Sequence, residues 1–208
     1  MLFLCLSHHA VRVDIVMDNA GFELLTDWCL AEFLVSSGLA SCVHFHVKTM
    51  PWFVSDVTPE DFNWTLEQMC AMNHLAISHF GQKWRQRLAD KSWIMEVDDF
   101  WCLPNDFAEM KNVSPTLYKN LSEPDLVIFK GDLNYRKLTG DLKWETTTDF
   151  MTSLRGFLPS PLCALRTLKS DSVTGLKPGQ ASAAEEENVD WMTVGEWAVL
   201  SFASDKIR

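Results

Sequence analysis

The 208-residue chain has no excess of basic residues and no long apolar run. It carries 18 Lys and Arg against 28 Asp and Glu, which gives a net charge of −10. This charge argues against a nucleic-acid partner, because phosphate backbones select basic faces, and against binding to an anionic membrane surface. No apolar segment is long enough to cross a bilayer. We therefore expect neither a nucleic-acid partner nor a membrane partner.

The sequence also has no Cys-x-x-Cys motif, and its six cysteines are scattered along the chain. In a chain of this size, such cysteines are typical of buried free thiols in a reducing compartment. We expect a cytoplasmic protein, with the nucleus as an alternative. A Cys/His nucleophile pair stays open, although nothing marks one cysteine for that role. Residues 1–6 resemble the core of a signal peptide, but they lack a basic start and a small-residue cleavage pattern, so we expect no signal peptide.

An internal linker, repeats and low-complexity segments are absent as well. Apolar runs that suit strands alternate with segments that suit helices, which predicts βαβ units and a mainly parallel sheet. Strands are expected at residues 11–17, 42–47, 93–97, 125–132 and 163–169, and residues 197–202 close the sheet. Helices are expected at residues 20–36, from 59 to about 89 with breaks, after Ser114-Pro115, from 134 to 138 and, exposed, at 181–187, with a loop at 101–111. The predicted fold is α/β: a three-layer αβα sandwich around a Rossmann-like sheet.

Polar side chains stand where the predicted strands end. Asp18 and Asn19 follow the first strand, Asp56 comes after the second, and Asp132 and Lys169 end two later strands. The carboxyl ends of parallel strands lie at one edge of a sheet, so these groups can converge. Asp18, Asn19 and Asp56 would then supply three oxygen ligands for Mg²⁺ or Mn²⁺. The alternative for each acid taken alone is that it caps a helix at a strand–helix junction.

The polar segment at residues 130–137, Lys-Gly-Asp-Leu-Asn-Tyr-Arg-Lys, is a candidate anion-binding turn. Gly131 permits close approach of the backbone, and the N–H groups of residues 133–135 would open a helix and hold an anion. Lys169 and Arg136 would neutralise the remaining charge of a phosphate. Taken alone this pattern is weak, because strand–Gly–Asp–helix junctions are common.

Two histidines, His44 and His46, lie two residues apart on the predicted second strand and therefore share one face. They could ligate a metal, but a structural role in a half-buried strand is the alternative, and a site for Mg²⁺ does not need them. The acidic run at residues 185–187 is expected to be a solvated face.

Four motifs resemble those of the metal-dependent damage-control phosphatases, the family once called domain of unknown function eighty-nine. They are Asp-Asn-Ala-Gly-Phe-Glu at 18–23, Lys-Thr-Met-Pro-Trp-Phe-Val-Ser-Asp at 48–56, Phe-Lys-Gly-Asp-Leu-Asn-Tyr-Arg-Lys-Leu at 129–138 and Arg-Thr-Leu-Lys at 166–169. The motifs occur in the family's order, and the last one marks its subfamily III. The resemblance extends from residue 13 to residue 202.

The resemblance implies hydrolysis of sugar phosphates, such as fructose 1-phosphate and fructose 6-phosphate, and of damaged phosphometabolites. It implies a divalent ion, Mn²⁺ or Ni²⁺, with Mg²⁺ and Co²⁺ as alternatives. The implied metal ligands are Asp18, Asn19 and Asp56, and the catalytic candidates are Asp18, Asp56 and Asp132. The implied substrate contacts are Asp18, Asn19, Asp132, Leu133, Asn134, Tyr135, Arg136 and Lys169.

The resemblance also implies a second activity, methylation of glutamates on the replication sliding clamp with S-adenosyl-L-methionine. No glycine-rich adenosylmethionine loop follows the first strand, so we rank this activity second. A third alternative is an inactive truncated form.

Family members carry a mostly helical region before the Asp-Asn strand, and this region is missing from the sequence. We therefore divide the chain into a non-family segment at residues 1–11 and a phosphatase α/β domain at residues 12–208. We expect this chain alone to be poorly stable and weakly active.

Overall fold

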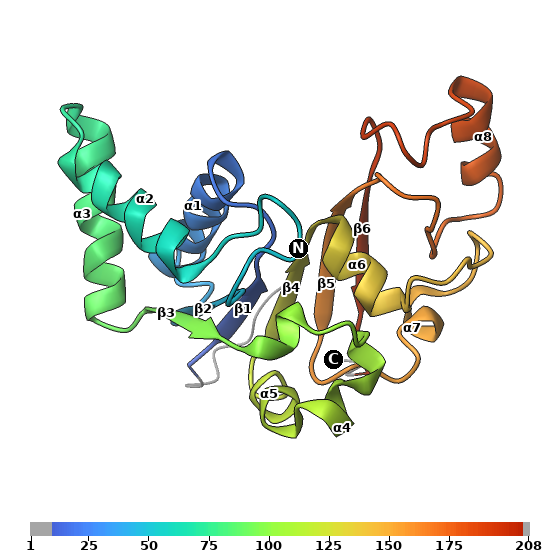
Figure 1. Cartoon of the computed structure of the whole chain (residues 1–208), viewed down its shortest axis with the longest axis horizontal. Coiled ribbons are helices and arrows are strands. Elements are labelled where there is room, and N and C mark those ends of the chain that lie inside the picture. Colours follow the sequence, from blue (N-terminus) through green and yellow to red (C-terminus); the bar gives the residue numbers. More distant parts are fainter. Residues whose placement is uncertain (1–9, 206–208) are drawn as a thin grey trace.

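The computed structural model describes residues 10–205 and is built around a six-stranded sheet (Figure 1). The strands are β1 (Arg12–Val16), β2 (Cys42–Val47), β3 (Trp93–Val97), β4 (Leu126–Lys130), β5 (Leu162–Thr167) and β6 (Ala198–Ala203). Their order is β3-β2-β1-β4-β5-β6, and every pair is parallel except β5 with β6. The strand order reverses between β1 and β4, and in open α/β sheets ligands bind at this position, outside the carboxyl ends of the strands.

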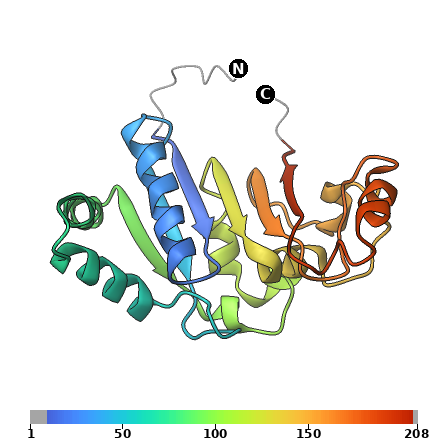
Figure 2. The ribbon, with the colours of Figure 1, turned by 90° about the horizontal axis from the view of Figure 1, so that it is seen from above.

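Helices cover both faces of the sheet, which confirms the predicted three-layer αβα sandwich (Figure 2). One face carries α1 (Phe22–Ser36), α2 (Pro59–Ala71) and α3 (Leu75–Ala89). The other face carries the 3₁₀ turns η1 (Asp99–Cys102) and η2 (Phe107–Glu109) with α4 (Met110–Val113), α5 (Pro115–Asn120), α6 (Gly131–Thr139) and α7 (Phe150–Ser153). The short α8 (Gln180–Glu187) packs beside the loop that follows β5.

The two layers of helices enclose two hydrophobic cores, because successive side chains of a strand point to opposite faces. On β1, Val13 and Ile15 pack in the core under α1, whereas Val16 packs in the core under α6. Trp28 of α1 is fully buried, and its ring centroid lies 4.7 Å from that of Phe62 on α2. Burial on both faces explains why the strands are nearly continuous apolar runs in the sequence.

The helical stretch expected from residue 59 to about residue 89 is two helices. α2 begins as predicted, with a capping box in which Thr58 Oγ1 accepts from Asp61 N and the Asp61 carboxylate accepts from Thr58 N. The first helix ends when Met72 adopts an extended conformation, and His74 then caps α3. Neither Gly nor Pro stands in this turn, so the sequence carries no strong signal for it.

The loop expected at residues 101–111 contains parts of η1, η2 and α4. Two aspartates explain these short turns. The Asp98 carboxylate accepts from Phe100 N, and the Asp106 carboxylate accepts from Ala108 N, so each side chain caps the turn that follows it.

The predicted buried thiols are only partly found. The cysteines among the described residues are free, but Cys102 is buried, Cys29 is exposed and the other three are half-buried. Cys5 and the segment similar to a signal peptide lie outside the described residues. The acidic run at residues 185–187 is exposed, as expected. None of the helices in residues 10–205 has the length and apolar character needed to cross a membrane.

The two histidines on β2 support the sheet from one face. His46 Nε2 lies 2.8 Å from the Asp14 carboxylate, and His44 Nδ1 lies 3.1 Å from the Glu96 carboxylate. Burial alone would raise the pKa of Asp14, but hydrogen bonds from His46 and Arg12 outweigh it and lower that pKa. These contacts favour the structural alternative for both histidines.

Candidate functional site

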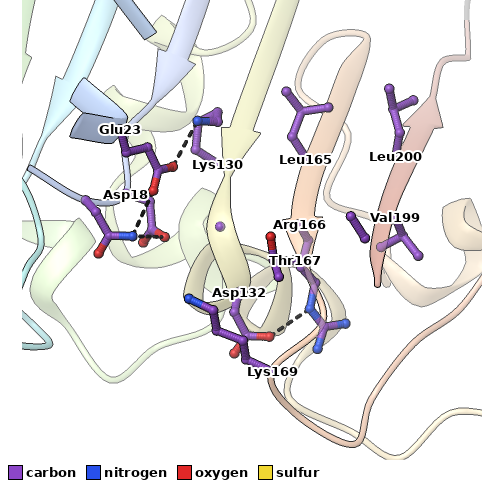
Figure 3. A pocket seen from close by; sticks show the side chains of 13 residues that line it. Asp18, Glu23, Lys130, Asp132, Leu165, Arg166, Thr167, Lys169, Val199 and Leu200 are labelled. Carbon is purple, nitrogen blue, oxygen red and sulfur yellow. Dashed lines mark hydrogen bonds and ion pairs between the residues drawn. The ribbon is translucent and has the colours of Figure 1, made fainter. Parts of the chain in front are cut away.

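The reversal between β1 and β4 opens into a pocket of about 450 Å³ (Figure 3). Its polar side is formed by the turn after β1, the start of α6 and the loop after β5. Its apolar side comes from β5 and β6. The lining residues are Asp18, Asn19, Glu23, Lys130, Gly131, Asp132, Leu165, Arg166, Thr167, Lys169, Ala198, Val199 and Leu200. Four of the predicted site residues, Asp18, Asn19, Asp132 and Lys169, therefore share one pocket.

The turn from β1 to α1 presents Asp18 and Asn19 to the pocket. Asn19 Nδ2 donates to Asp18 Oδ2 at 3.1 Å and to Glu23 Oε2 at 2.8 Å. Asn19 Oδ1 accepts from Ser55 Oγ at 2.6 Å. The amide thus keeps two carboxylates together at the carboxyl end of β1 although their charges repel.

The segment at residues 48–56 returns to this turn and carries Asp56. A short antiparallel bridge joins Asn19 to Asp56, with Val57 N donating to Asp18 O at 2.9 Å. The Asp56 carboxylate is buried and accepts from Lys48 Nζ at 2.6 Å and from Phe53 N at 2.6 Å. The three predicted metal residues therefore lie together, as the sequence predicted, although Asp56 does not line the pocket itself.

Burial raises the pKa of Asp18 from 3.8 to about 6. The Lys48 ammonium opposes this shift, whereas the neighbouring Glu23 and Asp56 carboxylates add to it. A half-buried carboxylate without an ion pair among the described residues is costly, and a bound cation would remove that cost.

The structure corrects the junction between β4 and α6. The strand ends at Lys130 and the helix begins at Gly131, so Asp132 lies in the first turn of α6 and not at a strand end. The N–H groups that open the helix are those of residues 131–133, not 133–135. Lys130 makes no side-chain cap, which leaves the sequence without a start signal.

Gly131 is required at this junction for two reasons. Its φ is +83°, a left-handed conformation that other residues rarely adopt, and a Cβ atom there would overlap the Asp18 carboxylate. Gly131 therefore allows the backbone of α6 to lie directly against Asp18.

Replacing Gly131 with Ala should displace the Asp18 carboxylate and reduce any metal-dependent activity by about 100-fold, in addition to about 1 kcal/mol of backbone strain. Gly156→Ala is the matched control. Gly156 has φ +89° but nothing within 4 Å of the added Cβ, so this variant should lose stability alone. Activity and thermal unfolding measured on both variants test the difference, and equal loss of activity in the two would contradict the assignment.

Asp132 is held by Arg166, a contact that the sequence did not predict. Arg166 Nε donates to Asp132 Oδ1 at 2.7 Å, and Ser170 Oγ donates to the same oxygen at 3.1 Å. Lys169 lies in the loop beyond β5 and not at a strand end, and it makes no ion pair within residues 10–205. It is the pocket-lining cation whose charge is not already offset by a described carboxylate (Figure 3).

Lys130 also lines the pocket, but its charge is already compensated. Its Nζ lies 2.6 Å from Asp27 Oδ1 and 2.9 Å from Glu23 Oε1. Burial alone would lower the pKa of Lys130, but these two carboxylates outweigh it and raise that pKa.

The remaining residues of the 132–136 motif do not line the pocket. Leu133 and Tyr135 are buried in the fold, and Asn134 Nδ2 donates to Met17 O and Lys130 O, which ties β1 to β4. The expectation that Arg136 faces the same pocket is wrong. Arg136 pairs with Asp141 at 2.7 Å and lines a second pocket, because its side chain turns toward the chain beyond the end of α6.

A divalent cation fits the groups after β1. Asp18 accepts one side-chain hydrogen bond among the described residues, from Asn19, and a carboxylate oxygen can accept more than one interaction, so Asp18 and Asp56 keep capacity for a cation. Within residues 10–205, no three side chains of His, Cys, Asp or Glu gather as a metal site. The group after β1 instead contains two carboxylates and one amide, which suits a hard cation that completes its shell with water.

The comparisons with known proteins agree with this geometry. A family model, the damage-control phosphatase ARMT1-like domain, matches residues 2–184. The damage-control phosphatase ARMT1 of Danio rerio is 52% identical over 193 residues, which cover 93% of this chain and 43% of the relative. The Homo sapiens protein of the same name is 48% identical over 193 residues, which cover 93% of this chain and 44% of the relative. This chain therefore spans less than half the length of these relatives.

Proposed function

This chain belongs to the damage-control phosphatase ARMT1-like family, and from that premise we propose that it hydrolyses phosphate monoesters of small metabolites. Fructose 1-phosphate, fructose 6-phosphate and damaged phosphometabolites are the proposed substrates. The observation that carries the proposal is the Asp18 carboxylate, which is held with a raised pKa in the same pocket as Lys169, a cation without an ion pair in residues 10–205. A carboxylate that favours a cation beside a lysine that favours an anion suits a metal–phosphate pair.

The proposed cofactor is a divalent cation held by Asp18, Asn19 and Asp56. Mn²⁺ or Ni²⁺ is the first choice, with Mg²⁺ and Co²⁺ as alternatives. When bound, such an ion polarises a phosphoryl oxygen and offsets negative charge in the site. Asn19 fits this role because its Nδ2 donates hydrogen bonds to the two neighbouring carboxylates, and these bonds fix the orientation of the amide group.

The chain's own residues provide the rest of the proposed mechanism. Lys169 binds the phosphoryl oxygens, and the first N–H groups of α6 add positive potential on the same side. Asp132, fixed through Oδ1 by Arg166 and Ser170, accepts hydrogen bonds from the substrate hydroxyls or moves a proton at its other oxygen, Oδ2. Leu165, Val199 and Leu200 form the apolar side of the pocket.

A phosphate-release assay tests the proposal. Fructose 1-phosphate and fructose 6-phosphate are each incubated with the chain and Mn²⁺, Ni²⁺, Co²⁺ or Mg²⁺, with and without EDTA. We expect EDTA to lower the rate by at least ~100-fold and added Mn²⁺ to restore it, because the carboxylates alone repel a phosphate. Phosphate release that is insensitive to EDTA would contradict the proposed metal site.

A further inference from the structure

Lys137 of α6 is a buried cation that the proposed mechanism does not use. Its residue is 8% exposed, and the side chain makes no ion pair among the described residues. Its Nζ donates to the backbone oxygen of Leu103 at 2.7 Å. A buried ammonium without a carboxylate partner is costly in free energy, so another interaction must offset the loss of water.

Three aromatic rings surround the Lys137 ammonium. The ring centroids of Trp52, Phe107 and Phe100 lie 5.1, 5.6 and 5.8 Å from Nζ. All three fall within the range of a cation–π interaction, which is stronger where water is excluded. Burial, with repulsion from Lys48, lowers the pKa of Lys137 to about 8. The contacts of Lys137 with these three rings join α6 to two other segments, residues 99–107 and residues 48–56.

The segment at residues 48–56 is also held near both of its ends. Close to Asp56, Ala20 N donates to Ser55 O at 2.8 Å and Ser55 Oγ donates to Asn19 Oδ1 at 2.6 Å. Thr49 Oγ1 donates to Cys102 Sγ at 3.5 Å, and Cys102 Sγ donates to the backbone oxygen of Met50 at 3.3 Å. Phe53 and Val54 point to solvent, with exposed fractions of 52% and 100%. The contact of Trp52 with Lys137 is therefore where the middle of this segment meets the body of the protein.

This contact lies one residue from a hydrogen bond to Asp56. The residue after Trp52 is Phe53, whose N–H donates to Asp56 Oδ2 at 2.6 Å. A shift of the backbone at Trp52, once its ring is released from Lys137, would move that N–H group. The carboxylate would then be held by Lys48 on one oxygen alone.

We propose that Lys137 is a positioning residue, whose ammonium holds Trp52 and thereby fixes the Asp56 carboxylate through the Phe53 N–H group. Its consequence for metal binding rests on the proposed function, but its effect on the segment at residues 48–56 does not. The two parts are therefore tested by separate measurements.

The first measurement is hydrogen–deuterium exchange on the metal-free protein. We expect Lys137→Met, which keeps the aliphatic length but loses the charge, to speed exchange in residues 48–57 about tenfold. Trp52→Leu should do the same. Lys111→Met is the control, because the exposed Lys111 Nζ lies 5.9 Å from the Tyr118 ring centroid, in the α4–α5 region outside the proposed site. Unchanged exchange in residues 48–57 of a folded Lys137→Met protein would overturn the proposal. If Lys137→Met does not fold, the same measurement on Trp52→Leu decides, and unchanged exchange there would overturn the proposal.

The second measurement is Mn²⁺ affinity by calorimetry. We expect each single variant to weaken binding about tenfold, the double variant to weaken it no further, and Lys137→Arg to restore it, because an arginine also stacks on aromatic rings. Faster exchange in residues 48–57 with unchanged Mn²⁺ affinity would overturn the link to Asp56. If the unaltered chain binds no Mn²⁺, the proposed function fails, and the exchange measurement alone then decides the role of Lys137.

Discussion

Replacing Asp18 with Asn should stabilise the metal-free protein at neutral pH and at the same time abolish its proposed metal-dependent activity. The side chain keeps its shape, and the amide oxygen of the variant can take the place of Asp18 Oδ2 as the acceptor from Asn19 Nδ2. What the variant loses is a charge that burial disfavours, since burial raises the pKa of Asp18 from 3.8 to about 6. Opposite effects on stability and activity are expected where a site keeps a strained group for function.

The stability gain should depend on pH in one direction. Below about pH 4 the Asp18 carboxyl is protonated in both the folded and the unfolded chain, so the variant gains nothing. Between pH 4 and about pH 6 the unfolded chain releases this proton first, so unaltered protein loses stability relative to the variant. Above the raised pKa the difference is constant. The side chain is only partly buried, so we expect a gain of about 1–2 kcal/mol, or roughly 2–8 °C in melting temperature.

Thermal unfolding in EDTA at pH 4 and pH 7.5 measures this gain, and phosphate release with Mn²⁺ measures the loss of activity, expected to be at least ~1,000-fold. Asp141→Asn is the control, because hydrogen bonds from Arg136 lower the pKa of Asp141, and its neutralisation should not stabilise the protein. A lower melting temperature for Asp18→Asn at pH 7.5, or retained metal-dependent turnover, would contradict the account of this site.

The strands and the place of Asp18 and Asn19 just after β1 were predictable because buried parallel strands are apolar runs that stop at polar residues. The sheet edge then places Asp18 at the pocket, whereas Asp56 lies well beyond the end of β2 and reaches Asn19 through the loop at residues 48–56. The start of α6 was not predictable in the same way. Lys130 makes no side-chain cap, and the helix follows the strand without a linker. The sequence pattern therefore placed the boundary three residues too late.

The partners of the charged side chains were the harder part. Asp132 and Arg136 are four residues apart on α6, and this spacing normally places two side chains on one helical face. The structure instead pairs Arg136 with Asp141, beyond Gly140, which ends the helix in a left-handed conformation. Asp132 is then free to pair with Arg166. Pairing between segments 34 residues apart depends on tertiary packing, which single-sequence patterns do not report.

Arg166 could have been suspected from the 166–169 motif, in which Lys169 alone received a role. The burial of Arg166 could not have been predicted, because arginines are almost never fully buried unless they are paired. The side chain is 0% exposed, and its guanidinium lies 4.4 Å from the Tyr135 ring centroid. It donates to Asp132, to Ser170 and to the backbone oxygen of Ser172. One side chain thus fixes both the first turn of α6 and the loop that carries Lys169.

Replacing Arg166 with Met should therefore lower the stability of the protein more than the loss of an exposed ion pair would. It leaves Asp132 half-buried without its cation and removes the donors to Ser170 and Ser172. We expect the free energy of unfolding to fall by about 3–5 kcal/mol and kcat/KM for a sugar phosphate to fall by at least ~100-fold. Arg166→Lys keeps the charge but offers one nitrogen where the arginine uses three, so it should recover part of the stability and little of the activity.

Arg87→Met separates this effect from destabilisation alone. Arg87 donates twice to Glu32, which joins α3 to α1, and neither residue lines the pocket. This variant should lose stability while KM stays unchanged at a temperature where circular dichroism shows it folded. If Arg166→Lys and Arg87→Met, matched for stability, change KM equally, then Arg166 acts only by supporting the fold. A rise in KM confined to the Arg166 variants would instead assign Arg166 to the placement of Asp132 and Lys169 around the phosphate.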